Sequence, residues 1–348
     1  MSQASSGIAL ARAYFADLIA PLLRERLPDV RYAAARVGAG SEVLGLDDAA
    51  SRDHDWGLRV QLFVSDAHQA RVESTLDTHL PAEFREYPVR FGFSGDPAER
   101  LRIDVTSVDA FVEERLGFDP RAAASVIDWL SLSGQAALEV VAGAVFEDQT
   151  GELTGLREAL TWYPDDIWRY VVACDWQRLD QELPLMGRAG ERGDDLGSRV
   201  IAARLVDIAV HLAFMLSRSW PPYAKWRGSA LGNLNGCSAI ARDLGRVLAT
   251  DRWEERQGAL GDALTGLARL QRDSGLPAPQ SAVQPFWDRP YVHLSRGLVQ
   301  GVLQRVEDPE VRSLPLGLGS VEQQTDNVDV LVYPDRRRRL VGAVCSAR

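Results

Sequence analysis

Residues 40–64 decide the fold, and they read GSEVLGLDDAASRDHDWGLRVQLFV. The stretch joins two predicted strands, residues 31–37 before it and residues 53–64 at its end, because apolar residues alternate in the second as they do in a half-buried strand. Gly40-Ser41 follows the first strand directly. Glycine lets a backbone approach a ligand closely, and a serine hydroxyl donates a hydrogen bond. The stretch therefore predicts a strand, a polar loop and a second strand.

Two carboxylates, Asp53 and Asp55, stand at the start of the second predicted strand. Residues two apart in a strand point to the same face, so both side chains are expected to aim at one point. Such a pair is costly unless a cation lies between its members, and Mg²⁺ is the usual cation where a triphosphate is bound. Asp47 and Asp48 are adjacent, point opposite ways and fit a solvated loop better.

A third carboxylate, Asp104, lies in the alternating stretch 101–108, which predicts another strand. If that strand lies beside residues 53–64, Asp104 completes a set of three carboxylates that holds two metal ions. It could also serve as a general base. Asp96, next to a proline, and Asp109 are the alternatives for this third position.

The remaining sequence predicts an α/β unit followed by helices. In the first part, residues 8–26 and 66–80 have helical spacing, and residues 89–93 are strand-like. Residues 274–289 fit a loop, and Arg336–Arg339 fit a solvated surface. The predicted domains are residues 1–110 and residues 111–348. In the second domain, apolar spacing predicts helices over residues 134–147, 153–160, 164–184, 195–218, 228–249, 253–273 and 290–306.

Composition narrows the classes of function. The net charge is −10, from 49 acidic and 39 basic residues, which argues against bulk binding of nucleic acid. Three scattered cysteines, with no disulfide or zinc spacing, fit a reducing cytoplasm. The start of the chain lacks the pattern of a signal peptide, and no apolar run is long enough to span a membrane.

The motif resembles that of the nucleotidyltransferase superfamily (polymerase-beta-like). That superfamily has a glycine-glycine or glycine-serine pair, about nine to thirteen residues, Asp-x-Asp/Glu and a later carboxylate. Here the eleven residues 42–52 separate Gly40-Ser41 from Asp53-His54-Asp55. Residues 187–198 and 220–226 are further similar to a bacterial family of unassigned function. That family joins such a domain to a helical part similar to that of aminoglycoside nucleotidyltransferases.

The resemblance implies an α+β protein. An N-terminal nucleotidyltransferase α/β domain with a mixed sheet would precede a mainly α-helical, substrate-binding C-terminal domain. The implied reaction is the Mg²⁺-dependent transfer of a nucleoside monophosphate from a nucleoside triphosphate, such as ATP, to a hydroxyl of a small, aminoglycoside-like acceptor. The implied catalytic and metal-binding residues are Asp53, Asp55 and Asp104, with two Mg²⁺ ions, and the implied nucleotide-binding residues are Gly40, Ser41 and Lys225.

Several alternatives stay open at this point. The acceptor could be a protein or tRNA partner, as in toxin–antitoxin-like systems, or the protein could bind nucleotide without catalysis. Lys225 is either a phosphate-binding lysine or a rim lysine packed between Tyr223 and Trp226. His211 fits a core histidine better than a ligand.

Overall fold

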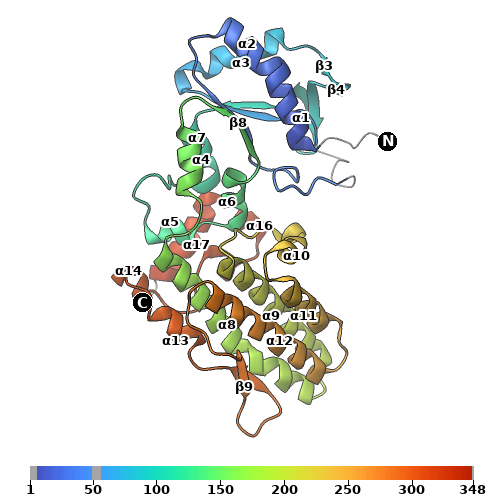
Figure 1. Ribbon diagram of the computed structural model, residues 1–348, viewed down its shortest axis with the longest axis vertical. Helices are drawn as coiled ribbons and strands as arrows, with labels where there is room; N and C mark the ends of the chain where they lie inside the picture. Colours follow the sequence, from blue (N-terminus) through green and yellow to red (C-terminus); the bar gives the residue numbers. More distant parts are fainter. Residues whose placement is uncertain (1–5, 49–55, 347–348) are drawn as a thin grey trace. The chain divides into compact units, whose positions relative to one another are not determined.

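The computed structural model describes residues 6–48 and 56–346, and Figure 1 traces the chain. The chain forms two compact units: residues 1–124 with 136–161 are unit 1, and residues 125–135 with 162–348 are unit 2. This division differs from the predicted boundary after residue 110. Residues 111–124 and 136–161, on the far side of that boundary, belong to unit 1 and supply helical residues and one strand to it.

The main sheet of unit 1 is mixed. Within the described residues its strands run in the order β7-β2-β1-β8, with bounds β1 (Ala33–Arg36), β2 (Val60–Phe63), β7 (Ile103–Thr106) and β8 (Ala144–Asp148). Strand β1 pairs antiparallel with both β2 and β8, and β2 pairs parallel with β7. The strand that carries Asp104 therefore lies directly beside β2, which is the adjacency that the sequence analysis required.

Short hairpins and helices complete unit 1. The hairpins are β3 (Glu83–Phe84) with β4 (Tyr87–Pro88), and β5 (Arg90–Phe93) with β6 (Asp96–Leu101). The helices are α1 (Gly7–Tyr14), α2 (Ala20–Arg26), α3 (Gln69–His79), α4 (Val108–Leu116) and α7 (Glu152–Ala159), and α6 (Gly134–Val141) begins in unit 2 and continues into unit 1.

The predicted helix 8–26 forms, but with a π-helical segment, Phe15–Ile19, between α1 and α2. Pro21 lies in the first turn of α2 and has no N–H to donate to the carbonyl four residues back. The preceding N–H, that of Ala20, instead reaches five residues back to the Phe15 carbonyl. The helix thus absorbs the proline without breaking.

The two faces of the sheet pack differently because strand side chains alternate. Val60 and Leu62 join the apolar core with residues of α1 and α3, such as Tyr14 and Val72. Phe63 points the other way and meets Phe111 of α4, with ring centres 5.2 Å apart. Gln61 shares the Phe63 face.

Two predicted elements of unit 1 are wrong in extent. In the described residues from 56 onward, the strand predicted over residues 53–64 begins at Val60, and a bend with a positive φ of 156° at Gly57 precedes it. The helix predicted over residues 134–147 ends at Val141, because Gly143 takes a φ of 71° and the chain then pairs with β1 as strand β8. Asp53 and Asp55 lie outside the described residues.

Unit 2 is mainly helical, and in Figure 1 helices α8, α9, α11 and α12 lie side by side. Its strands are β9 (Val283–Pro285) and β10 (Val292–Leu294). The helices are α5 (Val126–Leu130), α8 (Asp165–Glu191), α9 (Asp195–Leu216), α10 (Ala224–Asn233), α11 (Ser238–Ala249), α12 (Trp253–Asp273), α13 (Leu298–Leu303), α14 (Pro309–Arg312), α15 (Val321–Gln324), α16 (Val328–Leu331) and α17 (Pro334–Ser346).

Two predicted helices of unit 2 are also wrong in extent. The helix predicted over residues 228–249 is divided into α10 and α11, since Gly236 adopts a positive φ of 76° between them. The helix predicted over residues 290–306 contains only α13, because its first residues form β10 and pair with β9 inside the predicted loop 274–289.

The fold class is α+β, as predicted, with a mixed sheet in unit 1 and a helical unit 2. None of the helices in the described ranges combines the length and the apolar character that crossing a bilayer requires.

The prediction that Arg336–Arg339 form a solvated surface is wrong for Arg337. Arg337 is 1% exposed, and it donates from Nε to the Ser131 carbonyl at 3.0 Å and from Nη1 to the Leu331 carbonyl at 2.7 Å. Arg338 forms an ion pair with Asp128. These contacts join α17 to the segment around α5, so α17 is anchored in the core of unit 2 through Arg337.

We expect Arg337→Ala to lower the free energy of unfolding by about 1–3 kcal/mol, because the buried Ser131 carbonyl and the part-buried Leu331 carbonyl lose their donor. Arg339→Ala is the matched control on the same helix, where the side chain is exposed, and we expect a change within about 0.5 kcal/mol. Urea denaturation of both variants measures the difference. Equal stabilities would contradict the structural role of Arg337.

Candidate functional site

The loop that follows β1 folds around a buried guanidinium. Arg36, the last residue of β1, is 1% exposed and donates from Nε to Oε1 of Glu42 at 2.9 Å. Its Nη2 reaches the same oxygen at 2.5 Å and the Ala39 carbonyl at 2.6 Å, and its Nη1 donates to the Val37 carbonyl. A buried charge has to be paired, and here the Arg36 guanidinium pairs with the Glu42 carboxylate and also donates to backbone carbonyls of the turn.

Gly40 occupies a position in this loop that no other residue fits. Its φ is +143°, and a Cβ there would lie 2.5 Å from both Arg36 Nη2 and Glu42 Oε2. The neighbouring Ser41 is half-buried, and its carbonyl accepts the Leu46 N–H at 2.9 Å. The predicted phosphate-binding pair is therefore held in a defined turn, as pre-organised binding of a phosphate requires.

One side chain connects this loop to Asp104. Gln61 of β2 is 4% exposed, accepts the Val37 N–H on Oε1 at 3.0 Å and donates from Nε2 to Asp104 Oδ2 at 2.9 Å. The register explains this contact, because Gln61 and Asp104 are partners in the parallel pair of β2 and β7. Loop and carboxylate thus share one hydrogen-bond bridge.

Asp104 is exposed on β7, and its second oxygen has no partner among the residues that the structure describes. The two alternatives for the third carboxylate are occupied elsewhere: Asp96 pairs with Arg102 at 2.9 Å, and Asp109 pairs with Arg121 at 2.5 Å. Of the three, Asp104 lies on the strand next to β2.

Carboxylate oxygens are the ligands that Mg²⁺ prefers, so the chemistry of this edge fits the predicted metal. Within residues 6–48 and 56–346, no three acidic, histidine or cysteine side chains gather into a metal-binding group. Asp53 and Asp55, the predicted co-ligands of Asp104, lie outside those ranges. The competing acid Asp47 has a structural contact, since its Oδ2 accepts the Gly7 N–H at 2.6 Å.

Lys225 lies in unit 2, in the first turn of α10. Its side chain is exposed, and Nζ lies 4.8 Å from the centre of the Trp226 ring. It is also the single lysine among the 39 basic residues of the sequence. The lysine side chain carries a compact, freely rotating ammonium group, and such a group binds phosphate as a point charge. Its role toward a nucleotide stays a prediction.

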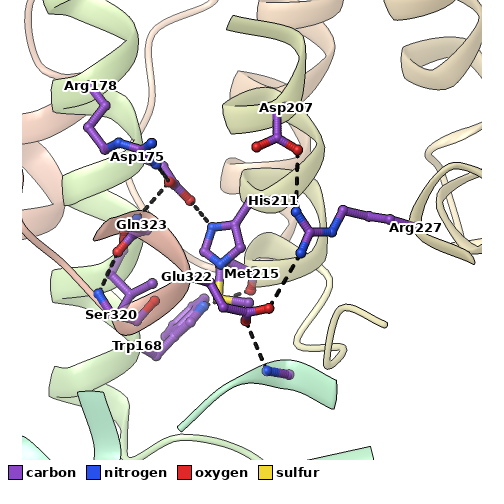
Figure 2. Close-up of polar contacts among 12 residues, drawn as sticks. Trp168, Asp175, Arg178, Asp207, His211, Met215, Arg227, Ser320, Glu322 and Gln323 are labelled. Carbon is purple, nitrogen blue, oxygen red and sulfur yellow. Dashed lines mark hydrogen bonds and ion pairs between the residues drawn. The ribbon is translucent and has the colours of Figure 1, made fainter. Parts of the chain in front are cut away.

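A buried polar network lies between α8, α9 and α15 of unit 2 (Figure 2). Asp175, fully buried, accepts from Gln323 Nε2 at 2.6 Å and pairs with His211 Nδ1 at 2.6 Å and with Arg178 at 3.5 Å. Nearby, Glu322 accepts the Gly134 N–H at 2.9 Å and pairs with Arg227 at 3.4 Å.

His211 is a core histidine, as the sequence analysis favoured, but its hydrogen bonding is unequal. Nδ1 is paired with Asp175, while the buried Nε2 has no partner in the described part of the chain. Burial alone would lower the pKa of His211, but the charge and hydrogen bond of Asp175, with the charge of Glu322, raise that pKa above its ordinary value of 6.5. The contact with Asp175 therefore favours the protonated, charged form of His211.

Sequence reasoning missed Arg36, Glu42 and Gln61. Gln61 had no distinguishing signal in the sequence, because a lone polar residue of a strand also fits a solvent-facing position, whereas in the structure all four residues of β2 are buried. Polar residues in such a strand usually have a specific partner.

We expect the protein to lose stability as the pH rises above 6.5, the ordinary histidine pKa, because His211 binds its proton more tightly in the folded state and that contribution disappears above the raised pKa. His211→Gln should have a flatter profile. His293→Gln, a half-buried histidine of the same unit, should keep the wild-type slope. Urea titrations at several pH values measure these slopes, and identical slopes in His211→Gln and wild type would rule out the protonated pair.

The chain is similar to a described protein family over part of its length and to a solved structure over most of it. A family model described as a domain of unknown function (DUF4037) matches residues 129–227, which include Asp175, His211 and Lys225. No curated protein matches the chain. A solved structure, described as a nucleotidyltransferase-like protein from Exiguobacterium sibiricum 255-15, is similar at 14% sequence identity and a TM-score of 0.32, over 77% of this chain and 76% of that one.

Proposed function

We propose that this protein is a Mg²⁺-dependent nucleotidyltransferase that moves a nucleoside monophosphate from a nucleoside triphosphate to a hydroxyl of a small acceptor. The observation that carries the proposal is the Gln61 bridge, which holds the start of the Gly40-Ser41 loop and the Asp104 carboxylate together on neighbouring strands. In the sequence, Gly40-Ser41 follows β1 and Asp53 and Asp55 precede β2, while Asp104 lies on β7, the strand that pairs with β2.

Each part has a role that follows from its chemistry. The turn at Gly40 and Ser41 would bind phosphate oxygens through backbone N–H groups and a hydroxyl. Asp53, Asp55 and Asp104 would hold two Mg²⁺ ions, which when bound neutralise the charge of the triphosphate and of the departing pyrophosphate. Lys225 would add a positive charge on phosphate.

The proposed reaction is a single displacement. The acceptor oxygen forms a bond to the α-phosphorus, and the bond between that phosphorus and the bridging oxygen to the β-phosphate breaks, so pyrophosphate leaves. Asp104, exposed and held through one oxygen, would accept the hydroxyl proton as general base. A net charge of −10 favours a cationic acceptor over nucleic acid, and an aminoglycoside-like molecule has both the charge and the hydroxyl groups.

The carboxylates are tested by thermal shift with each of the four nucleoside triphosphates and Mg²⁺. We expect one or more to stabilise the wild type, by about 2.7 kcal/mol at a hundred times the dissociation constant. The double variant Asp53→Asn/Asp55→Asn should lose the Mg²⁺-dependent part. In a pyrophosphate-release assay with cationic, hydroxyl-bearing acceptors, Asp104→Asn should be slower by about 10²-fold or more.

Asp109→Asn is the matched control, an exposed carboxylate of the same unit on α4 that should change neither result. The proposal fails if no nucleotide stabilises the wild type, or if the double variant keeps the same Mg²⁺-dependent shift.

Lys225 offers a second test, because an amine-reactive acylating reagent has no other lysine to modify. If Lys225 binds phosphate, nucleotide with Mg²⁺ at ten times the dissociation constant should slow its acylation about tenfold. Peptide mass spectrometry measures the rate, and the N-terminal amine is the internal reference. An unchanged rate, under conditions in which the thermal shift shows bound nucleotide, would remove Lys225 from the binding site.

A further inference from the structure

The Gln61 carboxamide has only one orientation that satisfies its surroundings. A backbone N–H can only donate and an ionised carboxylate can only accept, so Oε1 has to face Val37 and Nε2 has to face Asp104. Because Gln61 is 4% exposed, water does not replace either partner. The side chain therefore transmits the position of the loop backbone to one defined oxygen of Asp104.

We propose that Gln61 is a positioning residue for the metal site, an inference that rests on the proposed function. It fixes Asp104 Oδ2 and leaves Oδ1 for a cation, and it aligns that carboxylate with the loop that begins at Val37. An exposed aspartate without such a donor samples several rotamers, and each has to be given up when a metal binds. Hydrogen bonds to ligating carboxylates typically change metal affinity by about 10–100-fold.

The same unit contains a matched side chain with no connection to the site. Gln149 accepts the Tyr32 N–H on Oε1 at 3.3 Å and donates from Nε2 to Glu147 Oε1 at 2.8 Å. Like Gln61, it joins a backbone N–H to a carboxylate. It does so next to the pairing of β8 with β1, toward the opposite edge of the sheet from β7. A purely structural role would make both glutamines irrelevant to metal binding.

The experiment compares Gln61→Met with Gln149→Met, both of which keep the length of the side chain and remove its hydrogen bonds. The probe is Mn²⁺ with an α,β-methylene nucleoside triphosphate, and electron paramagnetic resonance of free Mn²⁺ gives the affinity. We expect Mn²⁺ affinity to fall about 10-fold or more in Gln61→Met and to stay at the wild-type value in Gln149→Met. Urea denaturation of the two variants reports the loss of stability separately.

Equal Mn²⁺ affinity in Gln61→Met and wild type would overturn the positioning role and leave the proposed function standing. If the wild type itself does not bind Mn²⁺ with the analogue, the proposed function fails, and this inference fails with it. Gln61→Leu, which is also apolar but shorter, is the second variant if Gln61→Met does not fold.

Discussion

The ion pair of Arg36 with Glu42 is the constraint on which the first unit depends. A guanidinium at the end of the inner strand β1 is buried, so its charge and its N–H groups have to be satisfied locally. The loop wraps around it, and two glycines make room: a Cβ at Gly40 would meet the guanidinium, and a Cβ at Gly143 would lie 2.0 Å from the Arg36 carbonyl. The turn after β1 and the entry into β8 are thus shaped around one residue.

Periodicity predicted the elements whose stability is mainly local. The helix around α1 and α2 and the helix α3 have clear apolar stripes, and the alternation in residues 101–108 places Asp104 opposite the apolar residues of β7. Strand β8 was missed because its apolar residues continue the helical pattern of α6. Only pairing with β1, more than a hundred residues earlier, selects the extended conformation, and no local window contains that information.

The candidate site could be predicted only in part, because it too depends on contacts between distant parts of the chain. The adjacency of the Asp104 strand and β2 was a condition that the sequence could state but not test, and the parallel pairing meets it. Gln61 was not predicted, because in a strand a lone polar residue fits a solvent-facing position equally well. Its burial becomes visible only when Val37 and Asp104 are placed on either side of it.

The division into units has a consequence for how this protein can be taken apart. The chain passes from one unit to the other at residues 124–125, 135–136 and 161–162, and the segment 136–161 brings β8 to the sheet of unit 1. A single cut therefore cannot release either unit whole, and neither can be exchanged as a cassette by one fusion junction. A recombinant protein that keeps both cores intact needs residues 136–161 together with residues 1–124. These two segments have to be exchanged together, because residues 125–135 of unit 2 lie between them in the sequence.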